Sequence, residues 1–299
     1  MNKYMLLMKK FYKEGSLKYR IITYLMNIIG YSNKNIAGLQ IKNKVFRYIK
    51  RKYKFEVPRS IVKNDFQGVR KTIWTCWFQG MENAPELVNI CIQSIKKNCS
   101  DYEIVVITYK NMAKYVTFPD YIIQKWKKGI IKDALMSDLL RMELLIKYGG
   151  IWMDATVFMT GKIPEIIQGS EFFIYSHLDS NDITMNYNNW FIKSNKNNEF
   201  LIRIRDFLYE YWKKEKRVKE YFIWHLAATN IANLYPNLLE NMPVISDVIP
   251  EQLCMVLNNK YNEKYWNYLC DLTTIHKLSY KVKCKNDCYT YLYKVREYQ

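Results

Sequence analysis

The sequence lacks an apolar run that could span a membrane, although 49% of its 299 residues are hydrophobic. A spanning helix needs about 20 successive apolar residues, and the apolar stretch at residues 21–29 is too short and too interrupted. The N-terminus also lacks the continuous apolar stretch and small-residue cleavage site of a secretory signal. No internal repeat or low-complexity linker is present. These absences favour a single α/β domain with an added helical part.

Cysteine is scarce, and the seven cysteines are odd in number. An odd count without a secretion signal favours reduced thiols in the cytosol. Cys284 and Cys288 are separated by three residues, with Cys270 and His276 upstream, so a zinc knuckle is conceivable. The spacing is irregular, which favours buried or incidental thiols instead.

Acidic residues are also few, with 28 Asp and Glu against 46 Lys and Arg and a net charge of +18. Residues 1–54 hold fourteen of the basic residues and one acid, Glu14, and so supply +13 of that charge. Ile21, Leu25 and Ile28 recur there at helical spacing. A basic amphipathic helix suits an anionic membrane surface, at about 1 kcal/mol per well-placed cation. We therefore predict that residues 1–56 are a basic helical extension, placing the protein in the cytoplasm on the inner face of the cell membrane. A helical cap packed on the remaining chain is the alternative.

The strong positive charge also raises the question of nucleic-acid binding. The basic and aromatic content would allow it. The sequence has no zinc-finger, RNA-recognition or helix-turn-helix signature, and the basic cluster lies outside the α/β segment. We therefore expect no nucleic-acid partner.

The chain after residue 70 alternates between strand and helix patterns. Residues 71–80 resemble a strand that ends in a turn at Gly80, residues 85–97 a helix, and residues 103–108 a second strand. This alternation predicts a parallel α/β core. Further segments follow: a short helix at 164–168, a strand at 171–175, and aromatic-rich helices at 200–214 and 220–234. His225 in the last of these is expected to be a packed structural residue.

The most informative stretch runs from Ser137 to Thr156. An amphipathic helix stops at Gly149, and the short apolar run Ile151–Met153 then delivers the carboxylate of Asp154 to a strand end. Asp138 and Arg141 share one face of that helix. An acid can accept hydrogen bonds from sugar hydroxyls, and a guanidinium can fork onto a phosphate. A surface ion pair of a few tenths of a kcal/mol is the alternative for these two alone.

These residues carry a family resemblance. Ser137-Asp138-Leu139-Leu140-Arg141 followed by Gly149-Gly150-Ile151-Trp152-Met153-Asp154 resembles the S-D-x-x-R … G-G-x-x-x-D core of DxD-type sugar transferases. These include yeast-type α-mannosyltransferases and the glucosylating domains of clostridial toxins. The similarity is greatest to the capsular polysaccharide synthesis glycosyltransferase family, with its G-G-x-W-x-D-A-T pattern. It covers roughly residues 71–281, strongly in the first half.

The resemblance implies a GT-A-type nucleotide-sugar transferase fold, with a mostly parallel sheet flanked by helices. It places a nucleotide-binding half at about residues 69–160 and an acceptor-side half at 161–299, within a domain spanning 57–299. It implies transfer of a hexosyl unit from a nucleoside diphosphate sugar, expected to be a UDP sugar, to a hydroxyl of a capsular or similar glycan. The acceptor is expected to be lipid-linked, and the configuration retained. Two alternatives are an inactive nucleotide-sugar-binding protein and a basic membrane-surface or nucleic-acid-binding protein.

The resemblance also implies residue roles. Asp154, Arg141 and Asp138 are the implied catalytic residues. The implied donor-binding residues are Trp77, Ser137, Asp138, Arg141, Asn189 and Lys277. Trp77 matches an aromatic that stacks on the uracil ring, although either Trp77 or Trp74 is expected in the core. Turn chemistry is the alternative explanation for Asn188-Asn189.

One position departs from the wider pattern, because Thr156 stands where the second acid of D-x-D is expected. A hydroxyl is a poor substitute for a carboxylate on a hard divalent cation. We therefore expect weak Mn²⁺ or Mg²⁺ binding that depends on the nucleotide, with Asp154 and His276 as protein ligands. A buried His276 beside a solvated Lys277 is the alternative.

Overall fold

The computed structural model describes residues 3–13, 17–28, 36–55, 71–177, 182–282 and 289–298. Cys284 and Cys288, and with them the question of a zinc knuckle, lie outside the described residues. Within those ranges, no helix has both the length and the apolarity needed to cross a membrane.

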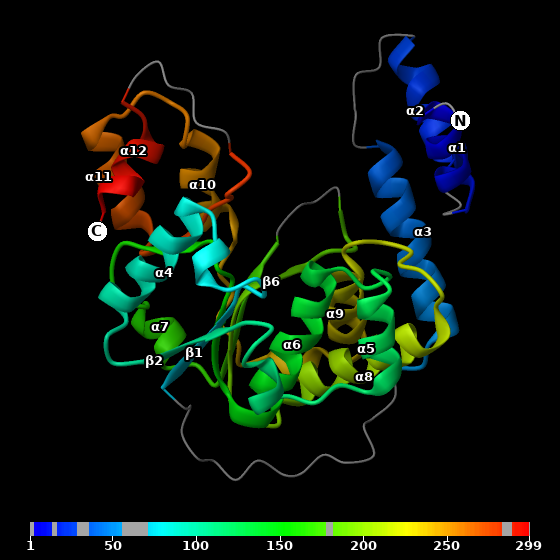
Figure 1. The fold of residues 1–299 in the computed structure, drawn as a ribbon, viewed down its shortest axis with the longest axis horizontal. Helices are drawn as coiled ribbons and strands as arrows, with labels where there is room; N and C mark the ends of the chain where they lie inside the picture. Colours follow the sequence, from blue (N-terminus) through cyan, green and yellow to red (C-terminus); the bar gives the residue numbers. More distant parts are fainter. Residues whose placement is uncertain are drawn as a thin grey trace.

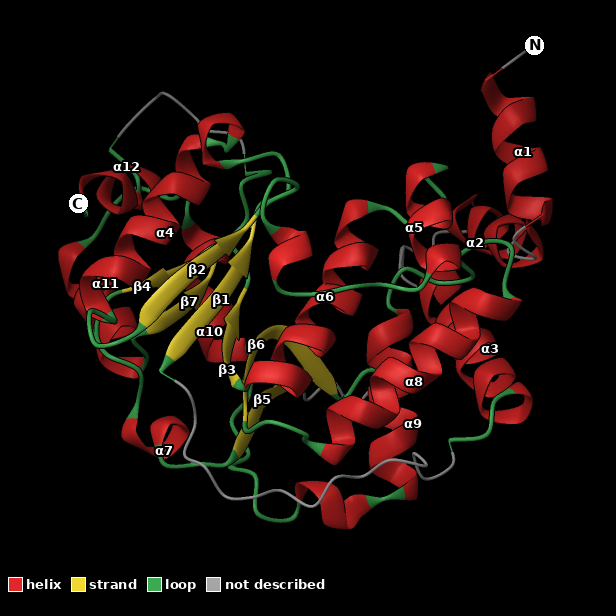
Figure 2. Ribbon diagram, turned by 60° about the horizontal axis from the view of Figure 1, so that its bottom comes forward, coloured by secondary structure: helices red, strands yellow, loops and turns green. Residues whose placement is uncertain are grey.

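A five-stranded sheet forms the centre of the molecule (Figure 2). Its order is β2 (Glu103–Ile107), β1 (Thr72–Cys76), β3 (Gly150–Met153), β6 (Tyr187–Ser194) and β5 (Phe172–Ser176). β1 is parallel to β2 and β3, whereas β6 is antiparallel to both β3 and β5. Four strands therefore point one way and β6 the other. A second, two-stranded sheet pairs β4 (Val157–Met159) with β7 (Ile275–Lys277).

Helices cover both faces of the sheet, and the strand sequences explain why. Neighbouring residues such as Ile73 and Trp74 belong to core clusters on opposite faces, and both side chains are fully buried. Strands buried on both faces need nearly continuous apolar runs rather than alternation. One side holds α5 (Asp120–Lys127), α6 (Asp133–Tyr148), α8 (Glu199–Lys214) and α9 (Ile223–Leu234). The other holds α4 (Glu86–Asn98), α7 (Glu165–Gln168), α10 (Val248–Val256), α11 (Glu263–Leu272) and α12 (Tyr291–Glu297) (Figures 1 and 2). Short 3-10 helices lie at Met81–Asn83, Met112–Lys114 and Pro236–Leu239. The predicted fold class, a mostly parallel sheet flanked by helices, is confirmed.

The helix stop before the central strand is confirmed at Gly149. This residue has φ 67°, and a Cβ there would lie 3.1 Å from the Ser194 carbonyl oxygen and 3.1 Å from the Lys196 nitrogen. A glycine meets both demands, since it lacks a Cβ and tolerates positive φ. The apolar run after it divides into β3 and β4, which lie in different sheets on either side of residues 154–156. The acid is thus placed where the chain leaves the main sheet.

The N-terminal segment consists of α1 (Lys3–Lys13), α2 (Leu17–Ile28) and α3 (Ile36–Lys52). α3 contacts α9, and Val45, Ile49, Tyr53 and Phe55 belong to the main core. Residues 36–55 therefore pack against the main body, as in the helical-cap alternative. α1 and α2 instead extend outward beside the upper part of α3 (Figure 1) and expose apolar side chains.

Candidate functional site

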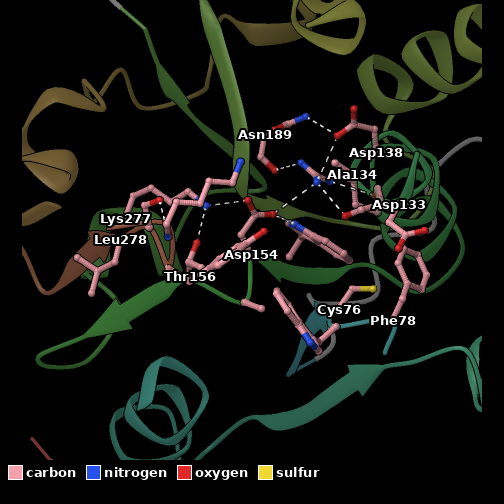
Figure 3. A pocket seen from close by; sticks show the side chains of 18 of the residues that line it. Cys76, Phe78, Asp133, Ala134, Asp138, Asp154, Thr156, Asn189, Lys277 and Leu278 are labelled. Carbon is pink, nitrogen blue, oxygen red and sulfur yellow. Dashed lines mark hydrogen bonds and ion pairs between the residues drawn. The ribbon is translucent and has the colours of Figure 1, made fainter. Parts of the chain in front are cut away.

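A cavity of about 580 Å³ opens at the carboxyl ends of β1 and β3 (Figure 3). Because β6 runs the opposite way, its first residues reach the same edge; the Asp154 amide donates to the Trp190 carbonyl at 2.8 Å. The cavity brings together seven residues that were predicted as donor-binding or catalytic: Trp77, Ser137, Asp138, Arg141, Asp154, Asn189 and Lys277. His276 does not line it.

Arg141 is the centre of a hydrogen-bond and charge network on the cavity wall. Its guanidinium donates to the Asn189 carbonyl at 2.6 Å and to the Ser137 hydroxyl at 3.0 Å. It also lies 3.3 Å from a carboxylate oxygen of Asp138 and 3.4 Å from one of Asp154. Arg141 is 4% exposed, so its pair with Asp138 is not a surface ion pair. Two carboxylates, one carbonyl and one hydroxyl together hold the guanidinium in place.

Asp154 is held as an ionised acid. One carboxylate oxygen accepts from the Trp152 indole at 2.9 Å, and the other accepts from the Lys277 ammonium at 2.8 Å. Burial alone would raise the pKa of Asp154, but the positive charges of Lys277 and Arg141 outweigh it and keep the pKa below its ordinary value. The carboxylate therefore stays charged at neutral pH and positions two cations.

Asp138 has a different environment from Asp154. Burial raises the pKa of Asp138 to about 7, with Arg141 opposing the shift, Asp154 adding to it and a hydrogen bond from Asn189 also opposing it. The Asn189 amide donates to Asp138 at 2.9 Å. Asn189 lies inside β6, so a turn does not explain it. The pKa values of the two acids are thus shifted in opposite directions, which is a common arrangement at functional sites.

Lys277 reaches the cavity from β7, which pairs with β4. Its ammonium donates to Asp154 at 2.8 Å and to the Thr156 hydroxyl at 2.9 Å, and Figure 3 shows the three side chains converging. The threonine in place of the second acid therefore serves as an acceptor for a lysine. No local pattern in the sequence predicts this contact between Lys277 and Thr156.

His276 points away from the cavity, because successive residues of a strand face opposite sides. Its imidazole lies 3.1 Å from the Thr160 hydroxyl and packs against the Phe158 ring, with centroids 6.2 Å apart. It is 1% exposed, and burial lowers its pKa to about 4. The structure does not bring His276 to Asp154, so the expected pair of metal ligands is not formed. His276 is therefore a buried residue, which was the alternative to its role as a metal ligand.

The donor set of the cavity does not fit a divalent cation. Mg²⁺ and Mn²⁺ favour several oxygen ligands, with carboxylates as the charged ones. Both oxygens of Asp154 already accept from Trp152 or Lys277, and the Thr156 hydroxyl also accepts from Lys277. Among the described residues, no group of three His, Cys, Asp or Glu could hold a metal ion.

Aromatic residues also line the cavity. Trp74 is the core residue of the predicted pair, with 0% exposure and its indole donating to the Gly149 carbonyl at 2.9 Å. Trp77 lines the cavity and packs edge-on against Tyr280, with centroids 5.4 Å apart. Its buried indole nitrogen has no partner among the described residues. One of the two tryptophans, Trp74, is thus a core residue, and Trp77 lines the cavity.

Several residues that line the cavity were not predicted as site residues, among them Tyr221, His225 and Tyr280. His225 is buried, as expected for a packed residue, yet it also reaches the cavity. Burial lowers its pKa to about 3, so the ring is neutral. The only signal for Tyr280 was its position three residues after Lys277.

Comparisons with known proteins agree with the motifs. Residues 26–295 match the family described as "Capsular polysaccharide synthesis protein". The O-glycosyltransferase braB of Annulohypoxylon truncatum is 23% identical over 235 residues, covering 70% of this chain and 51% of that protein. The chain therefore spans about half the length of this curated relative.

Two solved structures of glycosyltransferases match the chain over part of its length. One is the PaToxG glycosyltransferase, with 18% identity, a TM-score of 0.40, and coverage of 67% of this chain and 80% of that one. The other is GlyE of Streptococcus pneumoniae TIGR4, with 13% identity, a TM-score of 0.41, and coverage of 77% and 60%.

Proposed function

The chain belongs to the capsular polysaccharide synthesis family, and we propose that it is a glycosyltransferase acting on a nucleotide sugar. The donor is a nucleoside diphosphate hexose, with UDP as the nucleotide, and the acceptor is a hydroxyl of a capsular or similar glycan. The observation that carries this proposal is the cavity that Arg141, Lys277 and Trp77 line together. It offers two fixed cations for a diphosphate and an aromatic face for a base.

The chemistry follows from these positions. The base stacks on Trp77, a contact worth roughly 1–3 kcal/mol. Asp138 accepts from ribose or sugar hydroxyls when ionised, and Arg141 forks onto the phosphates. As the bond between sugar and diphosphate breaks, negative charge grows on the leaving oxygen. Preorganised cations stabilise that charge without reorganising during the reaction. The motif resemblance favours retention of configuration.

A donor screen tests this proposal. The full chain is incubated with a panel of UDP, GDP and other nucleotide sugars, and nucleotide release is measured with and without glycan acceptors. We expect release from one UDP sugar, accelerated by acceptor, with the anomeric configuration of the product read by NMR. Tight UDP binding without turnover on any sugar would instead favour the inactive binding protein. No binding of any nucleotide would refute both.

We further propose that α1 and α2 hold the protein on the inner face of the cell membrane. Their exposed apolar side chains include Leu6, Ile21, Leu25 and Ile28, which are 54%, 43%, 54% and 64% exposed. Neighbouring Lys and Arg residues add attraction to anionic lipid. This location would present the cavity to a lipid-linked acceptor.

Vesicle sedimentation tests the location. The full chain should bind vesicles that contain anionic lipid and be partly released at molar salt, where screening shortens electrostatic reach to about 3 Å. The apolar contacts should leave some salt-resistant binding. A triple Ser variant at Ile21, Leu25 and Ile28 should lose that salt-resistant part. A matched triple Ser variant at Val244, Val248 and Met255, which are also exposed, should keep it. Equal binding by both variants would refute the anchor.

A further inference from the structure

One of the two cations that contact Asp154 in the cavity is a lysine. The Lys277 ammonium lies against Asp154 and Thr156, the two positions at which a D-x-D pair would hold a metal ion. We infer that Lys277 takes the place of the divalent cation, so that this protein binds and cleaves its nucleotide sugar without a metal. The inference rests on the proposed function and deepens it.

The ligand set matches an ammonium. A lysine ammonium has three hydrogen-bond donors, and an ion pair with one carboxylate balances its charge. Asp154 and the Thr156 hydroxyl accept two of these donors, at 2.8 and 2.9 Å. The third donor is left for a ligand in the cavity. A threonine hydroxyl suits this arrangement, because a second carboxylate would add a charge that one ammonium cannot balance.

The same contacts disfavour a divalent ion. A metal ion at Asp154 would have to displace the Lys277 ammonium from the carboxylate oxygen. Otherwise the ion would lie close to the ammonium, and the two positive charges would repel each other. The other oxygen accepts from Trp152 at 2.9 Å and lies 3.4 Å from Arg141. His276, which could have added a neutral ligand, is buried on the opposite face of β7. His276 therefore adds no ligand to a metal at Asp154.

β7 also explains how the lysine is held in place. Lys277 pairs with Val157 in the antiparallel β4–β7 sheet, and the Leu278 amide donates to the Thr156 carbonyl at 2.9 Å. These backbone contacts place the lysine beside the residues it binds, although they are about 120 positions away in sequence. The position is therefore built by the backbone and does not depend on a loop closing over the donor.

The reaction balances with these groups alone. The bond between sugar C1 and the diphosphate oxygen breaks, and its electron pair stays on that oxygen. The acceptor oxygen bonds to C1, and its proton passes to the released diphosphate. Lys277 and Arg141 neutralise the charge that develops, while Asp154 acts as a positioning residue for both cations.

Isothermal titration with UDP, combined with donor turnover, tests the inference. The wild-type chain should show the same UDP affinity and turnover, within about twofold, in excess EDTA and in Mn²⁺. Lys277→Met should weaken UDP binding by roughly 10- to 100-fold, the loss expected for a charged hydrogen bond. Lys277→Arg keeps the charge and should bind UDP more tightly than Lys277→Met. The exposed Lys96→Met on α4 is the matched control and should behave as wild type.

Different results of these experiments would refute the metal-free inference and the proposed transferase function. A tenfold or larger loss of UDP affinity in EDTA, restored by Mn²⁺, would overturn the inference while leaving the transferase proposal standing. UDP binding by folded Lys277→Met that equals wild type would also overturn it. Absence of UDP binding in both EDTA and Mn²⁺ would remove the proposed function itself, and the inference with it. Circular dichroism establishes that each variant is folded.

Discussion

Replacing Glu215 with Gln should loosen the junction between α3 and the end of α8. Glu215 is 6% exposed and follows the last turn of α8. One of its oxygens accepts from the Tyr48 hydroxyl, from the Lys52 ammonium at 2.7 Å and from the Tyr53 hydroxyl at 2.9 Å. The other lies 3.2 Å from the Lys219 ammonium. Three of these four partners belong to α3 or directly follow it.

The magnitude follows from the pKa of this carboxyl. Burial alone would raise it, but hydrogen bonds from Lys52, Tyr48 and Tyr53 lower the pKa to about 2, from an ordinary value of 4.5. Without solvent screening, this difference would correspond to about 3 kcal/mol of stability. The Lys52 and Lys219 side chains are 37% and 38% exposed, so screening reduces the contribution to about 1–2 kcal/mol.

The sign of the pH dependence is fixed by the direction of the shift. A carboxyl with a depressed folded-state pKa stabilises the fold above its unfolded pKa, and that stabilisation is lost as pH falls from about 4.5 toward 2. Urea unfolding should therefore show Glu215→Gln to be about 1–2 kcal/mol less stable than wild type at pH 7. The gap should narrow when both proteins are measured near pH 3.

A control on the same helix makes this test specific. Glu210 pairs with Lys214, and their side chains are 44% and 48% exposed, so Glu210→Gln should change stability by less than about 0.5 kcal/mol. If Glu215→Gln behaves like Glu210→Gln at pH 7, the cluster does not anchor α3. A gap that persists unchanged at pH 3 would show that the lost energy is not carried by the ionised carboxylate.

Three further substitutions test the site and its framework. Asp154→Asn removes the charge that positions Lys277 and Arg141 with almost no change in volume, so turnover should fall by about 100-fold or more in a folded protein. Near-normal turnover in a variant whose calorimetric unfolding matches that of wild type would contradict the role of the Asp154 charge. Trp77→Ala should weaken UDP binding by roughly 10- to 100-fold in a titration, since stacking is lost, whereas Trp77→Phe should keep most of the affinity. Gly149→Ala should lower urea stability by about 1–3 kcal/mol because of its positive φ and close backbone neighbours, while Gly38→Ala, which meets nothing within 4 Å, should be neutral or stabilising. Equal effects of the two glycine changes would argue against strain at Gly149.

Much of the α/β core could be predicted because its signals are local. The stop at Gly149 and the apolar run of β3 lie within a few residues of each other, and both were found at the predicted places. The shared face of Asp138 and Arg141 follows from helical spacing alone. Strands β1, β2 and β5 and helices α8 and α9 also follow from local periodicity, with small shifts at their ends.

The boundary of the N-terminal extension depended on packing over long distances in sequence. Charge and apolar spacing were similar throughout residues 1–54, so the sequence offered no reason to separate α3 from α1 and α2. The separation arises because Val45 and Ile49 pack into the core that includes α9, and because Glu215 binds the end of α3. The composition of a segment gives its charge, but it does not show which apolar helix face packs against another part of the chain.

The sequence by itself determined which residue types could meet a nucleotide sugar, because the motif residues share a helix face or a strand end. Both His276 and Lys277 were predicted in the site, and only the tertiary structure decided that Lys277 alone of the two reaches Asp154. Two adjacent residues of a strand face opposite sides, so the register of β7 on β4 sends the lysine to Asp154 and buries the imidazole. That register is set by pairing between segments more than a hundred residues apart, and no local pattern encodes it.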